Sequence, residues 1–375
     1  MSKYKKWNWQ KDDWPNFQYN HDLIIKLEED FLKKSYIALG TSKAFTQEQK
    51  DLLIVELSTN EAYKTSEIEG EYLNRESLQS SIRRQFGLTV DRHKSLPAEE
   101  GLAEIIYQNY KGFMSPLSHE TLWEWHSLLM KDRKDLETIG AYRTHKEAMQ
   151  VVSGYIHKPN IHFEAPPSKT MLSEMEAFIK WFNDSQNNEF FKYKPLLRAT
   201  ITHLWFVCIH PFEDGNGRIG RLLVEKSVWQ SIGSPFLIGL SQTIYDNRKD
   251  YYNTLELQNK TNQIDTWITY FSKVLIDAED YTEQKINFIL KKDHFFKENL
   301  EKLNDRQLKV VNKMFEQGPK GFHGGLSPKN YCSITNVSSS TATRDLKELI
   351  SNRIFRKEGE LKGTRYYLKC LDKIN

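Results

Sequence analysis

Apolar residues recur three and four positions apart along most of the chain, and this spacing predicts a mostly helical protein. In the first such stretch, residues 22–39, it places Leu23, Leu27, Phe31 and Leu32 on one side, and Gly40 would end that helix. The same pattern predicts further helices at residues 47–67 and 75–86, from Pro97 and from Ser118 onward, and at residues 168–182, 195–209, 218–232 and 249–275.

Residues 147–167 differ from their helical neighbours. The β-branched pair Val151 and Val152 is followed by Gly154, by Pro159 and by Pro166-Pro167. Such residues favour extended strands and turns over helix. We therefore predict a β-hairpin or an extended flap here.

The last part of the chain predicts a separate unit. The charged run of residues 280–302 would continue as a linking helix. Beyond it, Leu308, Val311 and Met314 share one helix face, residues 339–350 predict another helix, and two short strands would flank Glu358-Gly359. Helices followed by a hairpin resemble a winged helix-turn-helix.

A chain of 375 residues is too long for one ordinary compact domain. We predict an N-terminal helical segment at residues 1–95, a central core at 96–280, the linking helix at 281–302 and the winged-helix-like domain at 303–375. Hydrophobic residues at 39% and charged residues at 27% are typical of a soluble globular protein and argue against a disordered one.

Charge is distributed unevenly along the chain. Residues 301–375 carry 15 Lys and Arg against 8 Asp and Glu, whereas the whole chain has a net charge of only +3. Arg344 and Lys347 would point outward from the helix at 339–350. A basic module of this kind suits DNA, but similar modules also bind proteins or form dimers, so both partners stay open.

No membrane segment is expected. The N-terminus has no apolar stretch that would serve as a signal peptide, and the longest apolar run, Leu204 to Ile209, is far too short to cross a bilayer. The three cysteines, Cys208, Cys332 and Cys370, follow no disulfide or metal pattern. We therefore expect a cytoplasmic protein with no membrane partner.

The candidate chemistry lies in the loop from His210 to Arg218. Pro211 disfavours helix at His210, so the apolar helix before it would end there. The run Asp214-Gly215-Asn216-Gly217 can adopt positive φ and direct several backbone N–H groups to one point. Arg218 would begin a helix whose N-terminus attracts anions, and Arg221 adds a second cation one turn later. A base candidate, a carboxylate, an anion nest and two arginines suit phosphoryl or nucleotidyl transfer.

This loop resembles the signature of the Fic family, H-x-F-x-(D/E)-G-N-G-R-x-x-R, at every fixed position from His210 to Arg221. The resemblance extends over roughly residues 1–280 and implies a Fic-type helical bundle that transfers AMP from ATP to a hydroxyl side chain of a target protein. It implies that His210 is the general base, that Asp214 holds Mg²⁺, and that Gly215, Asn216 and Gly217 cradle phosphate. Arg218 would bind the β-phosphate and Arg221 the γ-phosphate, with Ile219 and Gly220 between them in the nucleotide site.

Other positions match the family in part. Val151, Val152, Ser153 and Gly154 occupy the place of the family's flap, which aligns the target peptide by strand addition. Tyr251 and Asn259 resemble positions that contact adenosine. Thr65 to Gly70 fits the inhibitory pattern (S/T)-x-x-x-E-(G/N), which makes Glu69 the inhibitory residue. His203, in an apolar run, is interpreted as a core histidine.

The sequence is also compatible with other functions. The chain would be a DNA-binding regulator if the Fic domain served as a sensor. A Fic-fold kinase or phosphocholine transferase is a further alternative, although Arg218 and Arg221 favour AMP transfer. Removal of AMP is another, because Glu69 would be able to activate water. The sequence names no target protein, and it is compatible with a homodimer.

Overall fold

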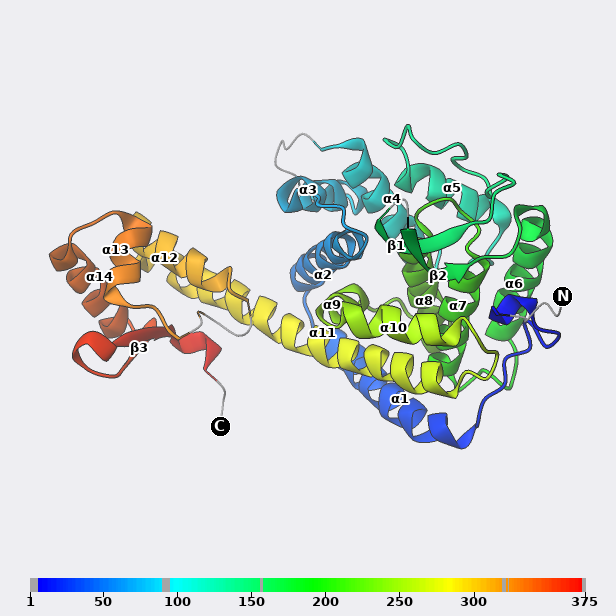
Figure 1. Cartoon of the computed structure of the whole chain (residues 1–375). Helices are drawn as coiled ribbons and strands as arrows, with labels where there is room; N and C mark the ends of the chain where they lie inside the picture. The colour runs from blue at the N-terminus through cyan, green and yellow to red at the C-terminus, as the bar shows by residue number, and fades with distance from the viewer. Residues whose placement is uncertain (1–5, 90–94, 156–157, 319–321, 323, 373–375) are drawn as a thin grey trace. The chain divides into compact units, whose positions relative to one another are not determined.

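The computed structural model describes residues 6–89, 95–155, 158–318, 322 and 324–372. Contacts divide the chain into two compact units, residues 1–282 and residues 283–375 (Figure 1). Each unit is described by itself. The finer four-part division that we predict from the sequence stays a prediction.

The first unit is built from helices, as expected. Its helices are α1 (Asp22–Ser42), α2 (Gln47–Ile68), α3 (Arg75–Gln85), α4 (Pro97–Lys111), α5 (His119–Leu129), α6 (Met171–Gln186), α7 (Pro195–Ile209), α8 (Asn216–Ile232), α9 (Leu240–Asp246), α10 (Arg248–Gln258) and the start of α11 (Asp265–Asn299), with short 3-10 turns η1 (Asn8–Gln10) and η2 (Ser168–Thr170). The helical fold predicted from the sequence is confirmed.

Several helix predictions differ from the structure in their ends or in their continuity. Gly40 does not stop α1, which continues to Ser42. The single helix predicted at residues 249–275 is two helices, α10 and α11, separated at Asn259 to Ile264. Hydrogen bonds from the N-terminal segment hold the chain in this break, since Asn8 N–H donates to the Asn259 carbonyl over 2.7 Å and Ile264 N–H donates to the Gln18 carbonyl over 2.8 Å. The short helix α9 was missed.

The buried face of α1 also differs from the predicted one. Ile24, Glu28, Phe31 and Ser35 are buried, whereas Leu23 is 43% exposed. A polar contact explains this difference. The carboxyl oxygens of Glu28 accept hydrogen bonds from the first N–H groups of α7, at Leu196 and Leu197. Burial raises the pKa of Glu28 to about 8, so these hydrogen bonds to its carboxyl oxygens, and not a full negative charge, fix which side of α1 faces the core.

Helices α7 and α8 form the centre of the first unit and lie side by side (Figure 1). Helix α7 packs against α1 and α6 as well, and α8 against α2, α4, α5 and α6. Almost every residue of both helices is buried. The loop that joins them is the one that carries the family signature, so it is held at both ends by the most buried helices of the unit.

The predicted hairpin is present as strands β1 (Gln150–Tyr155) and β2 (Lys158–Glu164), which pair antiparallel. The aromatic N-terminal segment packs against its base. Trp7 is 3% exposed and meets Phe163 edge to face at 5.5 Å, and Trp9 Nε1 donates to the Glu164 carbonyl over 2.6 Å. These contacts anchor the hairpin to the core.

The second unit contains the end of α11, then η3 (Leu300–Lys302), α12 (Asp305–Phe315), α13 (Pro328–Thr335), α14 (Ser339–Ser351), β3 (Phe355–Glu358), η4 (Leu361–Gly363), β4 (Arg365–Leu368) and η5 (Lys369–Leu371). Strands β3 and β4 pair antiparallel. Ala342, Leu346 and Leu349 of α14 are buried, and Arg344 and Lys347 are exposed. The winged-helix interpretation stays a prediction.

Within the described ranges, the helices lack the length and apolar character that a membrane crossing requires.

Candidate active site

His210 caps the C-terminus of α7 in a left-handed conformation, with φ 53° and ψ 58°. Its N–H still donates to the Phe206 carbonyl, which closes the last turn. Pro211 follows and prevents the helix from continuing. A non-glycine residue with positive φ is uncommon and needs support from its surroundings.

Arg143 provides that support. Its guanidinium donates to the carbonyl oxygens of His210 over 2.8 Å and Pro166 over 2.6 Å, and to Ser168 Oγ over 2.9 Å. Its backbone N–H donates to the Pro211 carbonyl over 2.9 Å. Arg143 is 1% exposed, so this cation lies in the core and ties the base of the hairpin to the loop. Arg143 was not predicted from the sequence.

The rest of the loop is braced internally. The Asn216 side chain exchanges hydrogen bonds with the backbone of Phe212, accepting over 3.0 Å and donating over 2.8 Å. Phe212 stacks on His126 with ring centroids 4.2 Å apart. The positive φ expected for the Asp214 to Gly217 run is found at Gly215, at 83°, whereas Gly217 is helical. The side-chain amide of Asn216 therefore holds the loop in shape, and the backbone N–H of Asn216 lies at the start of α8.

Helix α8 begins at Asn216, two residues before the predicted start. The N–H groups of the first turn of a helix have no partner within it, so those of α8 are suited to receive an anion beside Asp214. Arg218 and Arg221 are 1% and 2% exposed. Among the described residues, Arg218 Nε and Arg221 Nη1 are buried without a hydrogen-bond partner. These unsatisfied donors suit the oxygens of a phosphate chain.

Thr65 and Glu69, of the pattern (S/T)-x-x-x-E-(G/N), hold Arg221 from one side. Arg221 Nη2 lies 2.7 Å from Glu69 Oε1, and Arg221 Nε donates to Thr65 Oγ1 over 2.7 Å. Thr65 and Glu69 are four residues apart at the end of α2, so one helix face carries both. A Cβ placed on Gly217 would lie 2.3 Å from Glu69 Oε1. The carboxylate thus lies against the first turn of α8, where an anion would bind.

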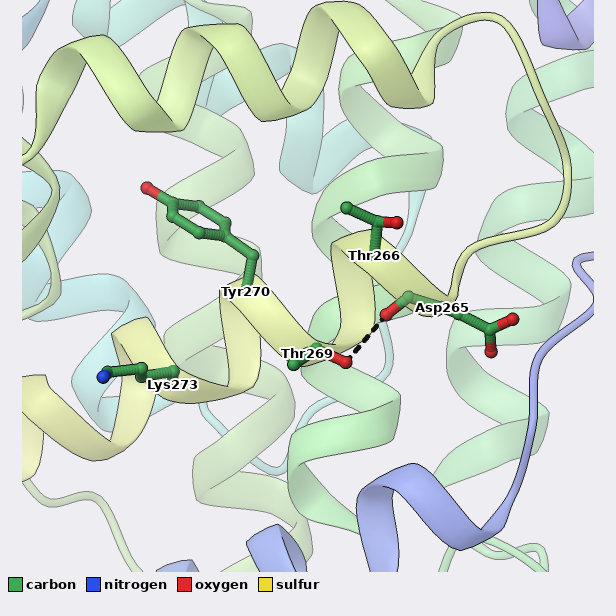
Figure 2. Close-up of a pocket in the computed structure, with 5 residues that line it drawn as sticks. All are labelled: Asp265, Thr266, Thr269, Tyr270 and Lys273. Atoms are coloured by element: carbon green, nitrogen blue, oxygen red, sulfur yellow. Dashed lines mark hydrogen bonds between the residues drawn. The ribbon is translucent and has the colours of Figure 1, made fainter.

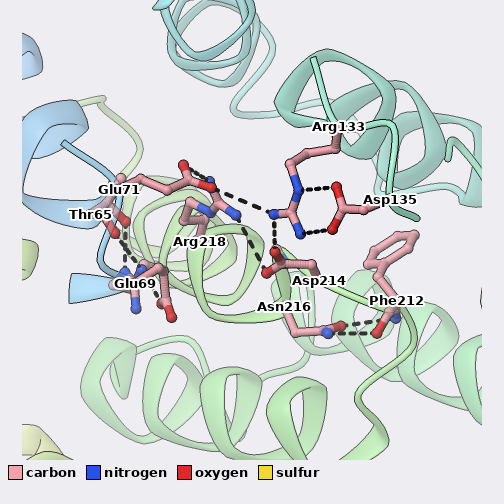
Figure 3. Close-up of polar contacts among 11 residues, drawn as sticks. Thr65, Glu69, Glu71, Arg133, Asp135, Phe212, Asp214, Asn216 and Arg218 are labelled. Atoms are coloured by element: carbon pink, nitrogen blue, oxygen red, sulfur yellow. Dashed lines mark hydrogen bonds and ion pairs between the residues drawn. The ribbon is translucent and has the colours of Figure 1, made fainter. Parts of the chain in front are cut away.

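A second set of charges surrounds Asp214 (Figure 3). Glu71 pairs with Arg218, and Arg133 pairs with Asp214. Arg218 Nη2 also lies 3.5 Å from Asp214 Oδ1. Burial would raise the pKa of Asp214, but Arg218 and Arg133 outweigh it and hold that pKa below its usual value. Neither Glu71 nor Arg133 was singled out from the sequence.

The His210 imidazole is set up to accept a proton. Its Nδ1 lies 3.2 Å from the Val207 carbonyl, so Nδ1 carries the hydrogen and Nε2 keeps its lone pair. Burial lowers the pKa of His210 to about 4, chiefly by disfavouring the charged ring. The ring is therefore neutral at physiological pH.

A divalent cation fits this site only together with a phosphate ligand. Among the described residues there is no group of three or more His, Cys, Asp or Glu that would hold a metal ion alone. Asp214 offers one ionised carboxylate beside the anion site of α8, which is the arrangement Mg²⁺ adopts with nucleotide phosphates. Arg133 would have to release Asp214 first.

The remaining predicted positions differ in what they contact. Val151 and Val152 of β1 are 37% and 50% exposed, and Ser153 and Gly154 follow them in the strand. Tyr251 is 2% exposed and its hydroxyl lies 2.7 Å from His203 Nε2. His203 is fully buried and stacks on Phe271, so its interpretation as a core histidine is confirmed.

Three other positions pack within the fold. Asn259 is 8% exposed and its Oδ1 accepts from Cys208 Sγ over 3.3 Å. Ile219 is fully buried, and a Cβ on Gly220 would lie 3.2 Å from His203 Nδ1, so Gly220 packs α8 closely against α7. Tyr251 is close enough to Arg221 and Glu69 for their charges to affect its pKa, and the nucleoside role of Tyr251 and Asn259 stays a prediction.

A hollow of about 440 Å³ lies along α11, lined by Asp265, Thr266, Thr269, Tyr270 and Lys273 (Figure 2). The Thr269 hydroxyl donates to the Asp265 carbonyl of the same helix over 2.9 Å. The lining includes none of the residues of the loop. We therefore assign the candidate active site to the loop between α7 and α8.

Comparison with known families supports this assignment. Residues 116–227 match the Fic/DOC family, and residues 7–88 match a domain of unknown function, DUF4172. The first match contains the whole loop, and the second contains Thr65, Glu69 and Glu71.

Curated relatives match over part of the chain. A protein adenylyltransferase fic-1 from Caenorhabditis elegans is 26% identical over 140 residues, which are 36% of this chain and 26% of that protein. A protein adenylyltransferase Fic from Drosophila mojavensis is 36% identical over 86 residues, which are 23% of this chain and 16% of that protein. The matched segments thus span about a quarter or less of these relatives' own length.

Solved structures share the fold. A Fic family protein from Desulfovibrio desulfuricans G20 has a TM-score of 0.51 at 19% identity and covers 93% of this chain and 96% of its own. Fic-1 residues 134–508 from C. elegans have a TM-score of 0.51 at 20% identity and cover 72% of this chain and 75% of their own.

Proposed function

We propose that this chain, which carries a Fic domain at residues 116–227, transfers AMP from ATP to hydroxyl side chains of target proteins. The single observation that carries the proposal is the placement of a neutral histidine beside an anion site. His210 ends α7 with Nδ1 at the Val207 carbonyl, and the loop leads within six residues to the N-terminus of α8 with Arg218 and Arg221.

The proposed step is a displacement at the α-phosphorus. The hydroxyl oxygen of the target forms a bond to that phosphorus, and the bond to the bridging oxygen of the β-phosphate breaks. Pyrophosphate leaves with the electron pair, and His210 Nε2 takes the hydroxyl proton. A neutral imidazole with Nδ1 already bonded to the Val207 carbonyl suits this role, because Nε2 is its one available acceptor.

The phosphate chain would be held by charge and by backbone. The first-turn N–H groups of α8, with the unpartnered Nε of Arg218 and Nη1 of Arg221, would bind its oxygens. Asp214 would hold Mg²⁺, which when bound neutralises the negative charge that develops on the phosphates. The target peptide would add to β1 at Val151 and Val152, whose side chains are exposed.

Glu69 would inhibit this activity. Its carboxylate pairs with Arg221 and lies against Gly217, the place where a phosphate oxygen would otherwise bind. An ATP molecule that cannot reach Arg221 would bind with its α-phosphate turned away from the target. The proposal therefore includes a resting state in which a side chain of the protein stands in for a phosphate.

Labelling of a cell lysate tests the function. The full chain is incubated with the lysate, α-³²P-ATP and Mg²⁺. Wild type is compared with Glu69→Gly and with the double variant Glu69→Gly, His210→Ala. We expect labelled proteins with Glu69→Gly and a loss of at least about a hundredfold in the double variant, as is typical when a general base is removed. His294→Ala, which changes an exposed histidine of α11 in the Glu69→Gly background, is the matched control. Labelling that survives in the double variant contradicts the role of His210.

The second unit supports an additional role in DNA contact. Arg344 and Lys347 are exposed on α14, and the sequence of this unit is basic. We expect the full chain to bind duplex DNA with an affinity that falls steeply with salt, and Arg344→Gln with Lys347→Gln to weaken that binding and its salt dependence. Equal binding by the double variant and wild type would exclude this face of α14.

A further inference from the structure

We infer that Arg133 is a further substrate-binding residue, a third cation that contacts the polyphosphate of the nucleotide once Asp214 and Glu71 release it. The inference rests on the proposed function, because it adds a contact to the same nucleotide site. It assigns a role to a residue that lies outside the signature, in the segment that follows α5 (His119–Leu129).

The position of Arg133 places it at the loop (Figure 3). Its Nη1 pairs with the Asp214 carboxylate and lies 3.8 Å from Glu71 Oε1. Glu71 pairs in turn with Arg218, and Arg218 lies 3.5 Å from Asp214. Two carboxylates and two guanidinium groups therefore alternate around one point, beside the N-terminus of α8.

Asp135 orients the guanidinium. Arg133 Nε donates to Asp135 Oδ1 over 2.8 Å and Nη2 donates to Asp135 Oδ2 over 2.7 Å, a bidentate pair on one edge of the planar group. Arg133 in turn lowers the pKa of Asp135 to about 2. This leaves Nη1 to point at the loop. The contact with Asp135, which lies outside the loop, thus orients the Arg133 guanidinium toward Asp214.

Substrate binding would change the partners of Nη1. Asp214 would release Arg133 when it holds a cation, and Glu71 would release Arg218 when Arg218 binds phosphate oxygens. Nη1 would then face a phosphate chain with its hydrogens unpaired, while Asp135 still holds the other edge. The side chain of Arg133 is 33% exposed and that of Arg218 is 2% exposed, so Arg133 is the arginine of this pair with room to follow the leaving pyrophosphate.

Binding measurements on the full chain test the inference without requiring turnover. Calorimetric titration would use Mg²⁺-ATP, inorganic pyrophosphate with Mg²⁺, and AMP. We expect Arg133→Met to weaken ATP and pyrophosphate by about tenfold and AMP by less than about twofold, because a charge-assisted hydrogen bond to β or γ oxygens is lost. Arg133→Lys should recover part of the loss. Arg75→Met, which removes a partly exposed arginine paired with Glu56, is the matched control.

The three titrations distinguish an Arg133 that binds phosphate from one with a structural role alone. A loss confined to ATP and pyrophosphate supports the inference. No change in any of the three, or an equal loss for ATP and AMP, overturns it, since a merely structural Arg133 would affect the site as a whole. Glu71→Gln should strengthen ATP binding severalfold, and Arg133→Met should remove part of that gain. If wild type and the Arg75 control bind neither ATP nor pyrophosphate, the proposed function itself is contradicted.

Discussion

Arg143 donates a hydrogen bond from its Nε to the carbonyl oxygen of His210 over 2.8 Å. The same side chain reaches the Pro166 carbonyl at the base of the hairpin. The left-handed conformation of His210 and the position of the β1–β2 hairpin are therefore set by one buried cation. If the hairpin carries the target peptide, Arg143 also fixes the peptide relative to the base.

Replacement of Arg143 should separate positioning from nucleotide binding. Arg143→Lys, in the Glu69→Gly background, keeps the charge but loses the planar fork that serves several acceptors. We expect kcat to fall by about tenfold or more with the KM for ATP nearly unchanged, because a small displacement of the base is costly to the reaction. We also expect a loss of about 2–4 kcal/mol in stability, since buried carbonyl groups lose charged donors.

The comparison variant for Arg143 is Arg84→Lys, which changes an exposed arginine of α3. Steady-state labelling gives kcat and KM, and urea denaturation gives stability. A rise in the KM for ATP without a fall in kcat would show that Arg143 does not position His210.

The pH dependence of labelling should reveal the low pKa of His210. Burial lowers this pKa to about 4, so the imidazole stays neutral, and able to accept a proton, until the pH falls through about 4. At pH 5.5 nearly all of it would be neutral, whereas a histidine with the ordinary value near 6.5 would be only about one-tenth neutral. We expect kcat at saturating Mg²⁺-ATP to differ by less than about twofold between pH 5.5 and 7.5.

A roughly tenfold fall in kcat at pH 5.5 would argue against this assignment. The Glu69→Gly variant is suitable for the measurement. Circular dichroism at both pH values checks that the chain remains folded.

Asp214 should govern the response to magnesium. Asp214→Asn keeps the size of the side chain but removes the charge that Mg²⁺ needs. In the Glu69→Gly background we expect labelling to fall by at least about tenfold and to require much higher Mg²⁺. Glu213→Gln changes the adjacent carboxylate, which accepts a hydrogen bond from Glu137 N–H, and should leave the magnesium titration unchanged. Identical titration curves for Asp214→Asn and its parent would remove Asp214 from the metal site.

The sequence predicted the helices and the loop because both are local patterns. The limits of α7 follow from Pro195 at its start and His210-Pro211 at its end, and both agree with the structure. The break between α10 and α11 could not be predicted in this way. It depends on hydrogen bonds from Asn8 and Gln18, which lie more than 240 residues away along the chain.

The charged residues of the site could likewise be predicted from the sequence only in part. Arg218 and Arg221 stand in a fixed pattern, so their position at the loop could be predicted. Arg133 lies in the run Lys131-Asp132-Arg133-Lys134-Asp135, and alternating charges of this kind usually mark a solvated surface. Arg143 is one arginine among many, and its burial becomes visible only when the loop and the hairpin come together. A signal for Glu71 was available, since it lies two residues after Glu69.

The contact between Glu69 and Arg221 yields the strongest regulatory prediction. Glu69→Gly removes a carboxylate that lies 2.7 Å from Arg221 Nη2, in a pair whose arginine is 2% exposed and whose glutamate is 25% exposed. A partly buried charged pair of this kind is worth about 1.5–3 kcal/mol, which corresponds to roughly a tenfold to hundredfold bias. We expect labelling with α-³²P-ATP to rise by that factor, because Arg221 becomes available to phosphate.

The double variant decides whether Arg221 carries this gain. Glu69→Gly with Arg221→Ala should return labelling to the wild-type level or below, since the released arginine is what ATP needs. Glu67→Gln, which changes a carboxylate paired with Lys64 on the same helix, should behave as wild type. If folded Glu69→Gly labels no more than wild type, Glu69 is not inhibitory. A pre-labelled target that loses AMP only when Glu69 is present would then assign this carboxylate to AMP removal, in which it activates the attacking water.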